Sequence, residues 1–224
     1  MSISENLKKV NEDIYNTCIK YGRDPKEVKL LAVSKTFSIE AINEAASAGQ
    51  IYFGESRVQE FLPKYNLRPD LKWHFIGHLQ SNKINKIAPL DICLQSVDSL
   101  ELAERLNRRL IRENQTLDVL LQVNIDEDPN KFGFLSAGLW QNIEKILELK
   151  GLNVLGLMTI GALQESSQEA RASFAKLRRL RDSLSEVTKK PFYELSMGMS
   201  SDYKEAIAEG ATIVRVGTAI FGRR

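Results

Sequence analysis

Residues 28–36, VKLLAVSKT, contain the first of a series of short apolar runs that decides the fold. The run is apolar at nearly every position, which favours a strand that is covered on both faces, as in a parallel sheet. Seven similar runs follow along the chain. The eight predicted strands are Val28–Val33, Ile51–Phe53, Trp73–Ile76, Ile92–Val97, Val119–Asn124, Val154–Met158, Phe192–Ser196 and Thr212–Val216.

Amphipathic helical patterns lie between these strands. Ser99 is a predicted N-cap, and Gly210 is predicted to end the last of these helices. About eight strand–helix units in 224 residues fit a (β/α)8 TIM barrel, whereas a doubly wound sheet usually has fewer strands. The predicted helices are Ile3–Tyr21, an additional helix before the first strand, and then Ser38–Ala48, Ser99–Arg112, Leu139–Leu149, Ser166–Val187 and Ser201–Ala208.

Composition excludes several classes of protein. The net charge is +2, too small for the basic surface of a nucleic-acid-binding protein, and 43% hydrophobic residues indicate a globular chain. The N-terminus lacks the apolar segment of a signal peptide, and no apolar stretch reaches the ~20 residues of a membrane span.

Cys18 and Cys93 stand alone and are predicted to be buried thiols. We therefore expect one domain, residues 1–224, in a cytoplasmic protein.

A lysine follows the first predicted strand, and an arginine lies within the last. Strand alternation puts Lys35 on the same face as Val33, so Lys35 projects from the carboxyl end of the first strand. Arg215 shares a face with Ile213 within an apolar run, where an arginine needs an anionic or hydrogen-bonding partner. Because the last strand of a barrel pairs with the first, Lys35 is expected beside Arg215. This setting should lower the proton affinity of the lysine and favour Schiff-base chemistry.

Small residues at the ends of the last two strands predict a phosphate site. Gly217 permits close approach of a ligand to the backbone, and Thr218 adds a hydroxyl. Residues 196–202, SMGMSSD, lead into a predicted helix, whose N-terminus favours anions. TIM barrels bind phosphate in these two loops. A lysine beside a phosphate site leaves two chemistries open, namely a pyridoxal phosphate protein and a class I aldolase acting on a sugar phosphate.

The chain resembles the pyridoxal phosphate homeostasis protein family, whose members are similar to the barrel domain of alanine racemase, a fold-type III pyridoxal phosphate fold. HFIGHLQSNK at 74–83 and SMGMSSD at 196–202 are the most specific of the matching segments. The others are AVSKT at 32–36, YFGESRVQE at 52–60, QVN at 122–124, GLMTI at 156–160 and RVGTAIFG at 215–222.

The resemblance implies that Lys35 holds pyridoxal 5′-phosphate as a Schiff base. It implies that Ser200, Gly217 and Thr218 contact the phosphate, and that Arg215 faces the pyridine nitrogen and weakens the ring as an electron sink. Members of the family are regarded as non-catalytic proteins that help to balance vitamin B6 and amino-acid pools. We expect a monomer that passes the cofactor to pyridoxal phosphate-dependent apo-enzymes.

An amino-acid racemase, or another fold-type III enzyme, is the alternative. Alanine racemase takes its second base from another domain of the partner subunit, and we expect no room for such a domain after Arg224. A racemase built on this chain would therefore use Lys35 as its only base, and general acid–base catalysis contributes about 10²–10⁴-fold for each positioned group.

Four further residues are weaker candidates for cofactor contact. Ser56 stands where many relatives carry asparagine, so an amide donor is missing there. His78 follows the third predicted strand, and Asn124 and Met158 end the fifth and the sixth. His74 and His78 are four residues apart on a strand, roughly 13 Å, which is too far for a shared metal ion, and we predict no metal site.

Overall fold

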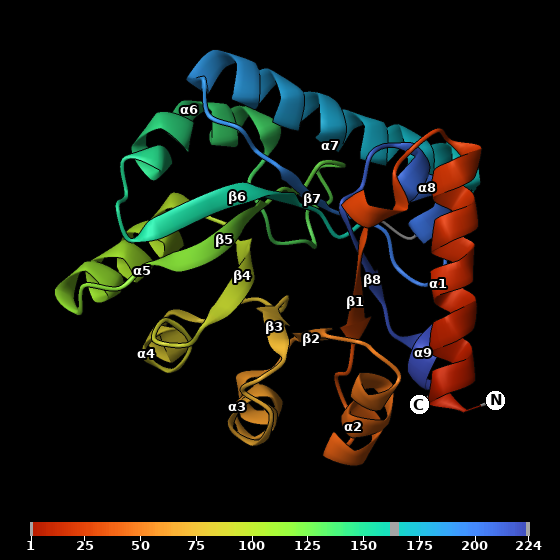
Figure 1. Ribbon diagram of the computed structural model, residues 1–224. Coiled ribbons are helices and arrows are strands. Elements are labelled where there is room, and N and C mark those ends of the chain that lie inside the picture. Colours follow the sequence, from red (N-terminus) through yellow and green to blue (C-terminus); the bar gives the residue numbers. More distant parts are fainter. Residues whose placement is uncertain (1, 162–165, 223–224) are drawn as a thin grey trace.

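The computed structural model describes residues 2–161 and 166–222, which include a closed barrel of eight parallel strands (Figure 1). Each strand pairs with the next along the chain, and β8 pairs with β1 to close the ring. The predicted (β/α)8 barrel is confirmed. The strands are β1 Lys29–Val33, β2 Tyr52–Glu55, β3 Lys72–Phe75, β4 Ile92–Val97, β5 Leu117–Gln122, β6 Leu152–Met158, β7 Glu194–Ser196 and β8 Ile213–Val216.

Helices surround the barrel, and their apolar faces contribute to the core outside the strands (Figure 1). The predicted N-cap Ser99 accepts a hydrogen bond from the Leu102 amide at 3.2 Å, and Gly210 has a φ of +94° after the end of α8. The α-helices are α1 Ile3–Lys20, α2 Ile39–Ser47, α3 Val58–Leu67, α4 Ile84–Ile87, α5 Leu100–Arg112, α6 Ser136–Leu147, α7 Ser167–Thr188, α8 Tyr203–Ala208 and α9 Thr218–Phe221.

The core has two parts, one on each side of the sheet. The larger part lies between the strands and the helices. The smaller part fills the barrel with Leu31, Cys93, Leu120, Met158 and Ile213, so the interior is packed with side chains. Both cysteines are buried, as predicted. Within residues 2–161 and 166–222, no helix has the length and apolar character needed to cross a membrane.

The predicted fifth strand, Val119–Asn124, lies two residues too far along the chain. The observed strand β5 begins at Leu117 and includes Asp118, an exposed residue whose carboxylate accepts a hydrogen bond from Asn153 on β6 at 2.7 Å. A charged residue is tolerated in a buried strand when it faces solvent, so the apolar pattern alone placed the start of the strand too late.

Candidate functional site

A cavity of about 390 Å³ opens at the carboxyl ends of β1 and β8. Its lining brings together Lys35, near the start of the chain, and four residues near its end, namely Ser200, Arg215, Gly217 and Thr218. These are the five principal site residues predicted from the sequence. Apolar side chains complete the wall, among them Val33, Phe37, Ile76 and Met199.

Barrel closure produces this meeting of the two ends of the chain. In the β1–β8 pair, Leu31 lies opposite Arg215 and Ala32 lies opposite Val216. Lys35 is two residues beyond the end of β1, and Gly217 directly follows β8. Both therefore lie at the carboxyl end of the barrel, and Lys35 is half-buried there.

Arg215 is a fixed cation in the wall of the cavity. Its side chain is almost fully buried, and its Nη1 and Nη2 donate hydrogen bonds to Ser196 Oγ at 2.8 Å and to the Thr159 carbonyl at 2.7 Å. Burial lowers the pKa of Arg215 to about 10, which still leaves the guanidinium protonated at neutral pH. Two neutral acceptors thus hold a positive charge in one orientation.

The support of Arg215 continues through the barrel interior. Ser196 Oγ donates to Gln95 Oε1 at 2.6 Å, and Gln95 Nε2 lies 2.7 Å from His74 Nδ1. Burial lowers the pKa of His74 to about 4, so this histidine is neutral at pH 7 and its Nδ1 accepts a hydrogen bond from Gln95 Nε2. Ser196 and Gln95 were not predicted individually as site residues. The sequence feature that could have identified them is a polar residue at an inward-facing position of an otherwise apolar strand.

Small residues and hydroxyls form the opposite wall of the cavity. The Gly217 amide donates to Ser200 Oγ at 3.3 Å, and Thr218 begins α9. A Cβ at position 217 would lie 3.2 Å from the Val33 carbonyl oxygen, closer than most such contacts, so glycine lets the chain after β8 pass close to the end of β1. Backbone N–H groups and hydroxyls of this kind are suitable donors to a phosphate.

The predicted helix Ser201–Ala208 begins two residues later than expected, at Tyr203. The preceding residue, Asp202, accepts the Met199 amide at 2.6 Å through its own carboxylate. Burial raises the pKa of this carboxyl group. The Asp202 carboxylate already accepts a backbone N–H in the turn before α8. The polar group that this turn presents to the cavity is therefore the hydroxyl of Ser200 and not the N-terminus of α8.

The four weaker candidates are absent from the described lining of the cavity. His78 Nδ1 lies 2.8 Å from Asp98, and its ring stacks on Phe132. Asn124 donates to the Asp128 carbonyl at 2.7 Å and so supports its own loop. Met158 is fully buried inside the barrel, and Ser56 follows β2. The described residues also contain no cluster of three metal-ligating side chains.

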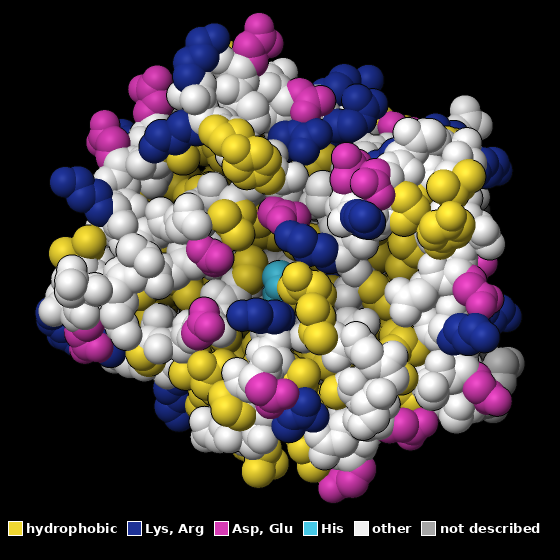
Figure 2. Space-filling model, viewed as in Figure 1, with side chains coloured by type: hydrophobic (Ala, Val, Ile, Leu, Met, Phe, Trp, Pro, Cys, Tyr) yellow, Lys and Arg dark blue, Asp and Glu magenta, His cyan; other side chains and the backbone are white. Residues whose placement is uncertain are grey.

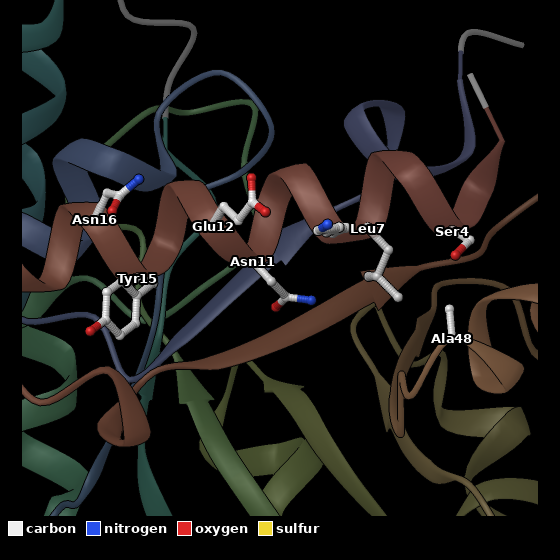
Figure 3. Close-up of a pocket in the computed structure, with 8 residues that line it drawn as sticks. Ser4, Leu7, Asn11, Glu12, Tyr15, Asn16 and Ala48 are labelled. Atoms are coloured by element: carbon white, nitrogen blue, oxygen red, sulfur yellow. The ribbon is translucent and has the colours of Figure 1, made fainter.

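Two other cavities differ in character. One, of about 190 Å³, lies at the amino end of the barrel and includes His74, and Figure 2 shows acidic and basic side chains around a central hollow that contains a histidine. The other, of about 600 Å³, is a groove along α1 toward Ala48, where Figure 3 shows Leu7, Asn11 and Tyr15 on one face of the helix. The groove contains a carboxylate, Glu12, and lacks the paired lysine and arginine of the first cavity.

Comparison with known proteins gives consistent results. The family described as "alanine racemase, N-terminal domain" matches residues 17–224. A pyridoxal phosphate homeostasis protein from Aquifex aeolicus is 42% identical over 226 residues, which cover 100% of this chain and 99% of the relative.

Solved structures agree with this result. PipY of Synechococcus elongatus, determined with pyridoxal phosphate bound, is 38% identical, with a TM-score of 0.87 over 99% of this chain and 100% of PipY. Alanine racemase of Clostridium difficile is 17% identical, with a TM-score of 0.78 over 98% of this chain and 60% of the racemase. The likeness to the racemase concerns the fold alone.

Proposed function

This chain belongs to the pyridoxal phosphate homeostasis protein family, and on that basis we propose that it binds pyridoxal 5′-phosphate in the cavity at the carboxyl end of its barrel. The observation that carries the proposal is the convergence of Lys35, Arg215 and the Ser200–Gly217–Thr218 wall on one cavity. An amine, a fixed cation and a set of N–H and hydroxyl donors match the aldehyde, ring nitrogen and phosphate of this cofactor.

Lys35 is the residue that would hold the cofactor covalently. Its side chain lies at the cavity beside apolar neighbours such as Val33 and Phe37. The cofactor would supply an aldehyde, and the Lys35 amine is the group in the cavity that could hold it as a Schiff base.

The remaining contacts would orient the ligand. Ser200, Gly217 and Thr218 would donate to the phosphate through hydroxyl and amide groups. Arg215, fixed by Ser196 and Thr159, would donate to the ring nitrogen and so keep that nitrogen unprotonated. Ser56, His78, Asn124 and Met158 are not among the residues that line the cavity, and this proposal gives them no contact with the cofactor.

We further propose that binding occurs without catalytic turnover. Among the described residues that line the cavity, Lys35 and Arg215 are the ones that ionise, and an arginine is a poor proton carrier. A racemase needs a second group to deliver a proton to the opposite face of the substrate. Incubating the protein with amino acids in D₂O should therefore give no deuterium at the α-carbon over many equivalents. Sustained exchange would contradict the proposal.

Loss of the lysine tests the binding proposal directly. Wild-type protein mixed with pyridoxal 5′-phosphate should acquire a visible absorption band, and borohydride should fix the cofactor on the peptide that contains Lys35. Lys35→Ala should lose both signals, whereas Lys20→Ala, a change on α1, should keep them. Labelling of a different lysine in wild-type protein would overturn the assignment.

Delivery of the cofactor is a separate part of the proposal. We propose a monomer that passes pyridoxal 5′-phosphate to pyridoxal phosphate-dependent apo-enzymes in the cytoplasm. The loaded protein should activate an apo-transaminase across a dialysis membrane no faster than free cofactor does, but faster when the two proteins share one chamber. Equal rates in both arrangements would exclude direct transfer, and sedimentation would report the oligomeric state.

A further inference from the structure

The backbone around Lys35 forms a strained turn. The Phe37 amide donates to the Ser34 carbonyl at 3.0 Å, which places Lys35 and Thr36 at the two central positions of a four-residue turn. Thr36 has a φ of +71°. Turns with a positive φ at the third position favour glycine there, and a β-branched residue in this conformation is strained.

A carboxylate on α3 holds the strained residue. Glu60 Oε2 accepts the Thr36 amide at 2.9 Å. This hydrogen bond is the main reason that the pKa of Glu60 lies below its usual range, so the contact involves a charged acceptor. Glu60 also pairs with Arg57 at 3.0 Å, a residue that is largely exposed.

A buried ion pair holds the other side of the turn. Lys64 Nζ donates to the Ser34 carbonyl at 3.0 Å and to Glu55 Oε1 at 2.6 Å. Ser34 Oγ donates to the same carboxylate oxygen at 2.8 Å. Glu55 is fully buried, and its Oε2 has no hydrogen-bond partner among the described residues. The charge of Lys64 therefore stabilises both a backbone carbonyl and a buried carboxylate.

We propose that Glu60, together with the Glu55–Lys64 pair, positions the Lys35 amine by holding the turn 34–37 in its strained form. The proposal deepens the proposed function and rests on it. Strain persists in a fold only where the surroundings over-determine it, and here contacts reach both neighbours of Lys35 from β2 and α3. Without the Glu60 contact, Thr36 would relax to a negative φ and move the root of the Lys35 side chain.

Glu60 is the suitable place for a test. Removing Glu55 or Lys64 would leave a buried charge unpaired and endanger folding. The side chain of Glu60 is partly exposed, so its removal leaves no charge buried without a partner. Glu60→Ala should slow the appearance of the visible band on mixing with pyridoxal 5′-phosphate by about tenfold or more, since small misplacements of a reacting group have effects of that size. Glu60→Gln, which retains an acceptor, should restore most of the rate. Gln59→Ala, an exposed change on α3, is the matched control.

Two further measurements separate positioning from damage to the site. Binding of 4′-deoxypyridoxine 5′-phosphate, which lacks the aldehyde, should differ less than twofold between wild-type protein and Glu60→Ala. Adding Thr36→Gly to Glu60→Ala should recover at least threefold in rate, because glycine adopts a positive φ without strain.

Equal rates for Glu60→Ala and Gln59→Ala would overturn the inference and leave the binding proposal intact. If Glu60→Ala lowered the affinity for the deoxy analogue by as much as it slows band formation, the inference would be overturned as well, because Glu60 would then shape the whole cavity. Failure of wild-type protein to form the band would instead refute the proposed function.

Discussion

At the residue scale, strand alternation and barrel closure account for the positions of Lys35 and Arg215 in the site. The period-two pattern predicted Lys35 on the same face as Val33 and Arg215 on the same face as Ile213, and both Lys35 and Arg215 line the same cavity. The contacts that hold them were not predicted. Glu60 reaches Thr36 only because the turn and α3 have particular orientations, and local sequence patterns do not specify such orientations.

Thr218 is predicted to be a direct contact of the phosphate. Thr218→Ala removes a hydroxyl that would donate to a charged oxygen, and such a bond is worth roughly 1.5 kcal/mol, or about tenfold in affinity. We expect pyridoxal 5′-phosphate to leave this variant about tenfold faster during dialysis. Thr116→Ala, at the amino end of β5 and thus far from the cavity, should behave as wild type. Equal retention in both variants would remove Thr218 from the phosphate site.

His74 should make the fold sensitive to acid. Its pKa is about 4 in the folded protein and about 6.5 when unfolded, so the unfolded chain takes up a proton first as the pH falls. Stability should therefore be lost between pH 6.5 and pH 4, by about 2 kcal/mol at pH 5. Urea unfolding at pH 7 and pH 5 measures this loss.

His74→Asn is the matched variant, because its side-chain oxygen can accept from Gln95 without titrating. The free energy of unfolding of this variant should fall less between pH 7 and pH 5 than that of wild type, by about 2 kcal/mol. Parallel losses in the two proteins would show that other groups dominate the acid response.

At the scale of elements, the long amphipathic segments were predicted well and the short ones were not. The helices α5 and α7 lie within one residue of their predicted bounds, because each has a serine N-cap and a sustained apolar face. In contrast, α3 and α4 were not predicted from the sequence. Pro63 lies inside α3, where a proline argues against a helix, and α4 spans four residues. The missed helix α3 is the one that carries Glu60 and Lys64.

The cap of α5 gives a prediction at this scale. Ser99→Ala removes the acceptor of the Leu102 amide, and loss of an N-cap typically lowers the free energy of unfolding by about 1 kcal/mol. Ser99→Asp should restore most of this loss, since aspartate is an equally good cap. Chemical denaturation of the three proteins is the measurement. A Ser99→Ala variant as stable as wild type would mean that packing alone sets the start of the helix.

At the scale of the whole molecule, the first helix supports the last elements of the chain. Figure 1 shows α1 alongside α8 and α9. Asn6 Nδ2 donates to the Ile220 carbonyl at 3.0 Å, and Tyr203 Oη donates to Asp13 at 3.0 Å. Because α9 begins with Thr218, these contacts connect the N-terminal helix to the wall of the cavity. The additional helix was predicted from the sequence, but its docking on the other end of the chain was not.

Arg23, which follows α1, makes two further hydrogen bonds to this part of the chain. Its Nη1 donates to the carbonyls of Ile207 and Ala211 at 2.9 and 2.7 Å, at the end of α8 and just before β8. Arg23→Met keeps the aliphatic stem and leaves both carbonyls without their charged donor, so we expect a loss of about 2–3 kcal/mol in the free energy of unfolding. Glu27→Gln, which removes only the exposed ion pair of Arg23 at 3.6 Å, should have an effect below about 0.5 kcal/mol.

If α1 and the closing strand unfold as one unit, the Arg23→Met variant should still give a single urea transition, at lower urea concentration, with fluorescence of the buried Trp73 and circular dichroism coinciding. The cofactor should also leave this variant faster than wild type, because β8 and the start of α9 carry Arg215, Gly217 and Thr218. Two separate transitions would show instead that α1 detaches before the barrel opens. In that case retention of the cofactor should match wild type, and α1 would have no part in the site.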